Sequence, residues 1–81
     1  MIAPQQVETM IRSKFPDAEV TVAGDGEHFE AIIVSEEFIG KNRVKQHQMV
    51  YAAVNEAMHS NTIHALSLKT YTPEAWQAIR Q

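Results

Sequence analysis

The chain has 81 residues, of which 44% are hydrophobic, and its formal net charge is −3 at pH 7. This length predicts a single domain spanning residues 1–81, because domains usually run from about 50 to 250 residues. The chain contains no cysteine, which excludes disulfides and thiolate metal ligands, so that the fold must depend on packing. A reducing cytosol or organelle matrix suits such a chain, and we expect a cytoplasmic protein.

The N-terminal stretch MIAPQQVETMIRSK lacks the apolar core of a signal peptide. No run approaches the roughly 20 apolar residues that a membrane-spanning helix needs. We therefore expect no association with a membrane. The negative net charge argues against nucleic-acid binding through overall charge.

The first part of the chain predicts a helix followed by a strand. Residues 4–14 carry apolar side chains at helical spacing, and Pro4 suits the first helical turn. The helix should end near Phe15, because a residue before proline avoids the α region. Residues 18–24 then alternate between apolar and polar side chains, as a half-buried strand does.

The sequence GDG at residues 24–26 predicts a tight turn, since glycine and aspartate tolerate the backbone angles of short hairpins. Residues 28–35 resume a strand pattern, with Phe29, Ala31 and Ile33 on one face. Two strands joined so closely should pair as an antiparallel hairpin.

A second helix is predicted from Arg43 to Met58, after a connector that turns at Gly40. Its apolar stripe is predicted to contain Val44, His47, Tyr51, Val54 and Met58, widened by Val50, Ala53 and Ala57. Residues 59–61 should end this helix.

Residues 62–70 predict a third strand, and Thr72 and Pro73 predict the N-cap and first turn of a short final helix. One face of the strand is predicted to carry His64, Leu66 and Leu68. A strand–helix–strand crossover makes the third strand parallel to the second. The predicted fold class is therefore α+β, with the order α-β-β-α-β-α and a small three-stranded mixed sheet.

No catalytic motif is visible in the chain. None of its serines lies in a nucleophile elbow, and neither a P-loop nor a G-x-G-x-x-G sequence is present. We therefore do not expect an enzyme.

The four histidines have ordinary structural explanations. His28 follows the predicted turn, where a loop histidine is usually solvated, and His47 lies on or beside the apolar stripe as a half-buried residue. His59 falls at a helix C-terminus, where a charged imidazole interacts favourably with the helix dipole. His64 stands among apolar residues, either as a core-edge histidine or as a ligand.

A shared site is the alternative for two of these histidines. If the second and third strands are parallel neighbours, His28 and His64 lie at the same end of the sheet, and their rings can face one ligand. Two imidazoles do not fill the four positions around a metal. Iron–sulfur clusters are held mainly by thiolates, so a cluster bound here would need a partner that supplies the sulfur.

Three cations, Lys41, Arg43 and Lys45, cluster at the start of the second helix, where the helix dipole disfavours positive charge. They form either an ordinary solvated face or a set of phosphate contacts on a nucleic acid.

Two sequence blocks carry a family resemblance. The first is F-x-G-x-x-x-V-x-x-H-x-x-V-Y, which runs from Phe38 to Tyr51, and the second is I-H-A-L-S-x-K-x-x-T-P-x-x-W, which runs from Ile63 to Trp76. In this order the blocks resemble the BolA-like family, particularly its short bacterial-type members, and the resemblance spans nearly the whole chain.

This resemblance implies a fold similar to the class II KH domain and a non-enzymatic partner of monothiol glutaredoxins. It also implies a [2Fe–2S] cluster shared with the glutaredoxin cysteine and glutathione, and not bound stably by this chain alone. The family's C-terminal histidine ligand matches His64. Its second ligand, a histidine or a cysteine from the loop between the first two strands, matches His28.

Cluster trafficking and iron or stress regulation are the roles that this resemblance implies. Because a histidine must be neutral to bind iron, cluster retention should weaken below about pH 6.5. Some family members are described as transcriptional regulators, so a DNA-binding protein that uses Lys41, Arg43 and Lys45 is the second hypothesis. The G-x-x-G loop of KH domains is missing, since only Gly40 is present there.

A stress-response scaffold without metal is the third hypothesis. We expect a monomer or a weak homodimer when the protein is alone.

Overall fold

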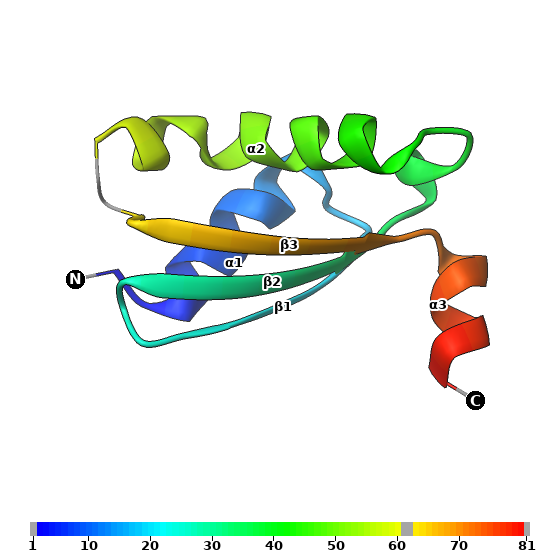
Figure 1. Ribbon diagram of the computed structural model, residues 1–81, viewed down its shortest axis with the longest axis horizontal. Coiled ribbons are helices and arrows are strands. Elements are labelled where there is room, and N and C mark those ends of the chain that lie inside the picture. Colours follow the sequence, from blue (N-terminus) through cyan, green and yellow to red (C-terminus); the bar gives the residue numbers. More distant parts are fainter. Residues whose placement is uncertain (1, 61–62, 81) are drawn as a thin grey trace.

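The computed structural model describes residues 2–60 and 63–80. The elements in chain order are α1 (Pro4–Lys14), β1 (Glu19–Gly24), β2 (His28–Val34), the short 3-10 helix η1 (Glu36–Phe38), α2 (Arg43–His59), β3 (Ala65–Tyr71) and α3 (Pro73–Arg80) (Figure 1). The predicted order α-β-β-α-β-α is confirmed. The predicted start of the third strand at Thr62, and the helix break at Asn61, lie outside the described residues.

The sheet has the order β1-β2-β3, with β2 in the centre. Strands β1 and β2 pair antiparallel, with Gly24 opposite Phe29, and β2 and β3 pair parallel, with His28 opposite Ala65. The predicted hairpin, the crossover and the mixed sheet are therefore confirmed. The parallel register brings the starts of β2 and β3 together at one end of the sheet.

The hydrophobic core lies between one face of this sheet and helices α1 and α2. Its most deeply buried side chains come from both helices, from β2, from η1 and from the segment before β3: Val7, Ile11, Ala31, Ile33, Phe38, Val50, Val54 and Ile63. The other face of the sheet carries exposed side chains, among them Thr21, Glu30, Ser67 and Lys69. This division follows from the alternation of side chains along each strand.

The buried face of α2 differs from the predicted stripe. Val50 and Val54 are fully buried or nearly so, whereas Val44 is 66% exposed and Tyr51 is 38% exposed. Val44 lies about 100° around the helix from the centre of the face that Val50 and Val54 define. The prediction was wrong at Val44 and, by a smaller margin, at Tyr51, because the buried face of the helix is narrower than the predicted stripe.

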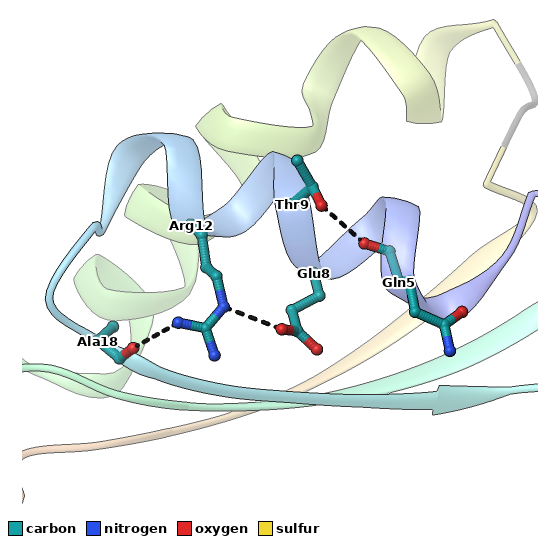
Figure 2. Close-up of polar contacts among 5 residues, drawn as sticks. All are labelled: Gln5, Glu8, Thr9, Arg12 and Ala18. Atoms are coloured by element: carbon teal, nitrogen blue, oxygen red, sulfur yellow. Dashed lines mark hydrogen bonds and ion pairs between the residues drawn. The ribbon is translucent and has the colours of Figure 1, made fainter.

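Arg12 links α1 to the segment that leads into β1 (Figure 2). Its Nε lies 2.9 Å from Oε2 of Glu8, one helical turn earlier, and its Nη1 donates a 3.4 Å hydrogen bond to the carbonyl of Ala18. Thr9 in the same helix donates its hydroxyl to the carbonyl of Gln5. The guanidinium therefore connects the helix to the loop that starts the sheet.

Gln46 connects the start of α2 to β3 and to the preceding loop. Its Oε1 accepts a 2.7 Å hydrogen bond from the hydroxyl of Thr70, and its Nε2 donates a 2.7 Å bond to the carbonyl of Lys41. The amide side chain thus fixes the distance between the first turns of α2 and the second half of β3.

Helix α3 projects from the end of the sheet (Figure 1). The predicted N-cap is confirmed, since the Thr72 hydroxyl accepts a 3.2 Å hydrogen bond from the amide of Ala75. The Trp76 ring packs on Tyr71, with 5.2 Å between ring centroids, and Ile79 is 56% exposed. None of the helices in the described part of the chain is long and apolar enough to cross a membrane.

Candidate functional site

The loop between β1 and β2 is built around the carboxylate of Asp25. Its Oδ1 accepts hydrogen bonds from the amides of Glu27 and His28, at 2.9 and 2.8 Å. Gly26 has φ = 100°, a backbone angle that other residues rarely adopt. A side chain at position 24 would come within 2.5 Å of the His28 carbonyl. The GDG sequence therefore fixes where β2 begins and where His28 stands.

The parallel ladder places His64 beside His28. The amide of Ala65 donates a 3.0 Å hydrogen bond to the carbonyl of Glu27, and Ala65 is the register partner of His28. The two imidazole rings have centroids 6.1 Å apart and are nearly perpendicular, at 87°. The prediction that both histidines lie at the same end of the sheet is confirmed.

His64 is not a core-edge residue. It lies just before β3 and is exposed, whereas Leu66 and Leu68 of the strand are buried. The expectation that these three side chains share one face was therefore wrong for His64, because the regular alternation begins only at Ala65. An exposed imidazole is available to a ligand or a partner.

Asp25 is a member of this site that the sequence predicted only as a turn residue. Its Oδ2 lies 3.8 Å from Nδ1 of His28. The amides of His28 and then Glu27 donate to this carboxylate and hold its pKa below the ordinary value of 3.8. A carboxylate that accepts a hydrogen bond from the second ring nitrogen commonly orients a histidine metal ligand, and Asp25 lies just beyond hydrogen-bond distance of His28. The signal in the sequence was the aspartate three residues before a histidine across a tight turn.

The donor set fits a metal that receives further ligands from elsewhere. Two imidazoles on one tetrahedral metal have ring centroids about 5 Å apart, given metal–nitrogen bonds of about 2.0–2.1 Å. The 6.1 Å between the His28 and His64 centroids is close to this value. Among residues 2–60 and 63–80, no group of three or more histidine, cysteine, aspartate or glutamate residues is arranged to hold a metal ion. A second set of ligands would have to come from another molecule.

The remaining two histidines lie in other places. His47 is half-buried on α2, as predicted, and His59 is the exposed last residue of α2, at the helix C-terminus. Their positions agree with the structural roles predicted for them.

The three cations Lys41, Arg43 and Lys45 are all exposed around the start of α2. The side chain of Asn42 caps this helix by accepting a 2.9 Å hydrogen bond from the amide of Lys45. The start of α2 and the β1–β2 hairpin, which leads into His28, lie at opposite ends of the molecule (Figure 1). The structure therefore keeps the basic segment apart from the histidine pair.

These features define a small α+β domain with a mixed three-stranded sheet and a pair of exposed imidazoles where two parallel strands begin. A sequence model of the BolA family, described as BolA-like protein, matches residues 2–75. The chain belongs to the BolA-like family.

Individual relatives agree with this assignment. The chain is 41% identical over 76 residues to Acid stress protein IbaG of Escherichia coli (strain K12), covering 94% of this chain and 90% of the relative. It is 30% identical over 90 residues to DNA-binding transcriptional regulator BolA of the same strain, covering 99% and 85%. The solved structure of a bolA protein homologue from Coxiella burnetii has a TM-score of 0.85 and 37% identity, covering 95% of this chain and 99% of that chain.

Proposed function

We propose that this protein is a non-enzymatic adaptor that forms a heterocomplex with a monothiol glutaredoxin. In that complex a [2Fe–2S] cluster is shared among the glutaredoxin cysteine, glutathione and two histidines of this chain. The observation that carries the proposal is the exposed His28–His64 pair, with 6.1 Å between ring centroids. The chain has no cysteine, so the thiolates must come from the partner.

Each residue of the site has a distinct role in this proposal. His64 and His28 supply neutral imidazole nitrogens, the donor type that replaces two cysteines on one iron in Rieske centres. When bound, the cluster supplies the iron that these nitrogens bind. Asp25 lies 3.8 Å from Nδ1 of His28, and a hydrogen bond formed there when the ligand binds would direct the opposite nitrogen of that ring toward the ligand.

The proposed role is iron–sulfur cluster trafficking or iron and stress regulation. Family membership supports an adaptor or regulator, and one similar protein carries the name acid stress protein. The exposure of both rings supports a site that is completed by a partner.

The test is to mix the protein with a cluster-loaded monothiol glutaredoxin and glutathione, and to follow visible absorption and circular dichroism. The wild-type chain should produce a new spectrum that differs from that of the glutaredoxin alone, and His64→Ala should abolish it. His59→Ala, which removes another exposed histidine, is the matched control and should leave the spectrum intact. An unchanged heterocomplex spectrum in His64→Ala would remove that ligand from the proposal.

A nucleic-acid-binding transcriptional regulator is the second candidate. The exposed cations Lys41, Arg43 and Lys45 favour it, and similar proteins are named DNA-binding transcriptional regulators. A fold similar to the class II KH domain would be consistent with this role. A metal-free stress-response scaffold is the third, and an iron and sulfide assay of the complex purified with its partner separates it from cluster binding.

A further inference from the structure

The His28–His64 pair offers two of the four ligands that surround a tetrahedral metal ion. Both side chains are exposed, and their ring centroids lie 6.1 Å apart, close to the spacing of two imidazoles on one such metal. Among residues 2–60 and 63–80, no third histidine, cysteine, aspartate or glutamate is arranged with them to hold a metal ion. Two positions around the metal are therefore left to another molecule.

The donor atoms select the kind of metal ion. Imidazole nitrogen is a ligand for zinc, copper and nickel ions, whereas magnesium and calcium ions prefer oxygen ligands. Zinc in structural sites is almost always held by four protein ligands in a tetrahedral shell. One chain without cysteine cannot close such a shell with this pair, but two chains can.

A second copy of this chain supplies the two missing ligands. In a two-fold symmetric dimer both copies use the same surface, so a metal ion on the axis receives His28 and His64 from each copy. The start of β3 and the β1–β2 hairpin lie at the same end of the long axis of the molecule (Figure 1). Two copies would therefore meet end to end, through the surface that carries the histidine pair.

The charge around the pair makes this dimer depend on the metal. Strands β1 and β2 and their loop contain no lysine or arginine but four carboxylates, those of Glu19, Asp25, Glu27 and Glu30. Asp25 and Glu27 are exposed, and the carboxylate of Asp25 lies 3.8 Å from the His28 ring nitrogen. Two such loops repel each other when they meet, whereas a divalent cation between them is attracted to both. The metal ion is both the bridge and the compensating charge.

We propose that two copies of this chain bind one divalent transition-metal ion, with zinc as the probe, through His28 and His64 of each copy. The product is a metal-bridged homodimer with four imidazole nitrogens around the ion. This inference rests on the same histidine pair as the proposed function and adds a form of regulation to it. The homodimer occupies both imidazoles of each copy, so it and the glutaredoxin heterocomplex exclude each other, and zinc opposes cluster binding.

The experiment uses the full chain alone, with neither glutaredoxin nor cluster. Zinc is titrated into the protein while light scattering measures the mass and isothermal titration calorimetry measures the stoichiometry. We expect the mass to double at one zinc ion per two chains, a chelator to reverse the change, and magnesium to have no effect. In ¹⁵N-labelled protein the amides of His28 and Ala65 should shift, and one set of signals should remain because the two copies are equivalent.

Three variants test the ligands. His28→Ala and His64→Ala should each lose the doubling of mass, because either change leaves two imidazoles in place of four. Both side chains are exposed and outside the core, so the variants should keep the amide spectrum of a folded protein. His59→Ala removes another exposed histidine and should form the dimer as the wild type does.

Three outcomes would overturn the proposal. The first is one zinc ion per chain without a change of mass, which would identify a site completed by water. The second is a doubled mass that persists with the chelator, which would identify an interface that needs no metal. The third is a dimer of His64→Ala that forms as readily as that of the wild type, which would place the metal on other ligands.

The cluster titration with glutaredoxin is a separate measurement, so the two ideas can fail independently. A new heterocomplex spectrum without a zinc-dependent dimer would overturn only this inference. A zinc-dependent dimer without a heterocomplex spectrum would overturn only the proposed function.

Discussion

The centroids of the His28 and His64 imidazole rings lie 6.1 Å apart, at the end of the sheet where β2 and β3 begin. The parallel register and the GDG loop produce this relationship, since one fixes the strand pair and the other fixes the start of β2. Both rings are exposed and make no contribution to the core. Neither ring is needed for packing, so both are accessible to the shared ligand that we propose.

The charge of Asp25 makes a pH-dependent contribution to stability. Its pKa is held below 3.8 by the amides of His28 and Glu27. A carboxylate with a depressed pKa stabilises the fold above its unfolded pKa and loses this effect as the pH falls through its folded pKa. In Asp25→Asn, the amide oxygen can still accept the two hydrogen bonds, but the charge is lost. We expect the wild type to melt at a higher temperature at about pH 6, and the difference to shrink below pH 3.8. A difference that is constant over this range would contradict the explanation.

Phe38 is the largest fully buried side chain among residues 2–60 and 63–80. Its ring lies 5.6 Å from that of Phe15. Phe38→Ala should lower the free energy of unfolding by about 3–5 kcal/mol, because it removes apolar contacts and leaves a cavity. Urea denaturation measures the change. The adjacent Ile39, which is 61% exposed, provides the control, and Ile39→Ala should change stability by no more than about 0.5 kcal/mol. If both variants lowered the free energy of unfolding equally, the assignment of Phe38 to the core and Ile39 to the surface would be wrong.

Asn42 caps α2 through its hydrogen bond from the amide of Lys45. Asn42→Ala should lower the free energy of unfolding by about 1 kcal/mol, since an orphan amide of the first turn loses its partner. Asn42→Asp keeps an acceptor at this position and should retain most of the stability. The measurement is the melting temperature of the wild type and the two variants. Equal melting temperatures for the alanine and aspartate variants would show that the cap has no effect.

The DNA-binding candidate predicts a specific salt dependence. If Lys41, Arg43 and Lys45 each contact a phosphate, replacing all three by alanine should reduce the slope of log K against log salt concentration by roughly 2 to 3. The measurement is fluorescence anisotropy with a labelled duplex over a salt series. Identical slopes for the wild type and the triple variant would exclude these residues as phosphate contacts.

Local signals were sufficient to predict the order of the elements and the mixed sheet. The GDG turn, the strand alternation and the Thr72–Pro73 helix start each depend on residues close in the sequence. The parallel pairing of β2 and β3 followed from the crossover between them. This pairing, in turn, was enough to predict that His28 and His64 lie close together.

Features that depend on tertiary contacts could not be predicted in the same way. Val44 fits a helical stripe, but the sheet and α1 contact a narrower face of α2. Gln46 is an ordinary polar residue in the sequence, and its partner Thr70 belongs to a distant strand. The exposure of His64 depends on where β3 begins, which the apolar residues around it did not reveal.

The most direct measurement of the central claim is pulsed electron paramagnetic resonance of the reduced cluster in the heterocomplex. Only this chain is labelled, with ¹⁵N-histidine, and the glutaredoxin is unlabelled. We predict strong couplings from two ¹⁵N-labelled histidine nitrogens, one of which is lost in His64→Ala and the other in His28→Ala. A cluster spectrum without any coupling to labelled histidine would contradict ligation by this pair.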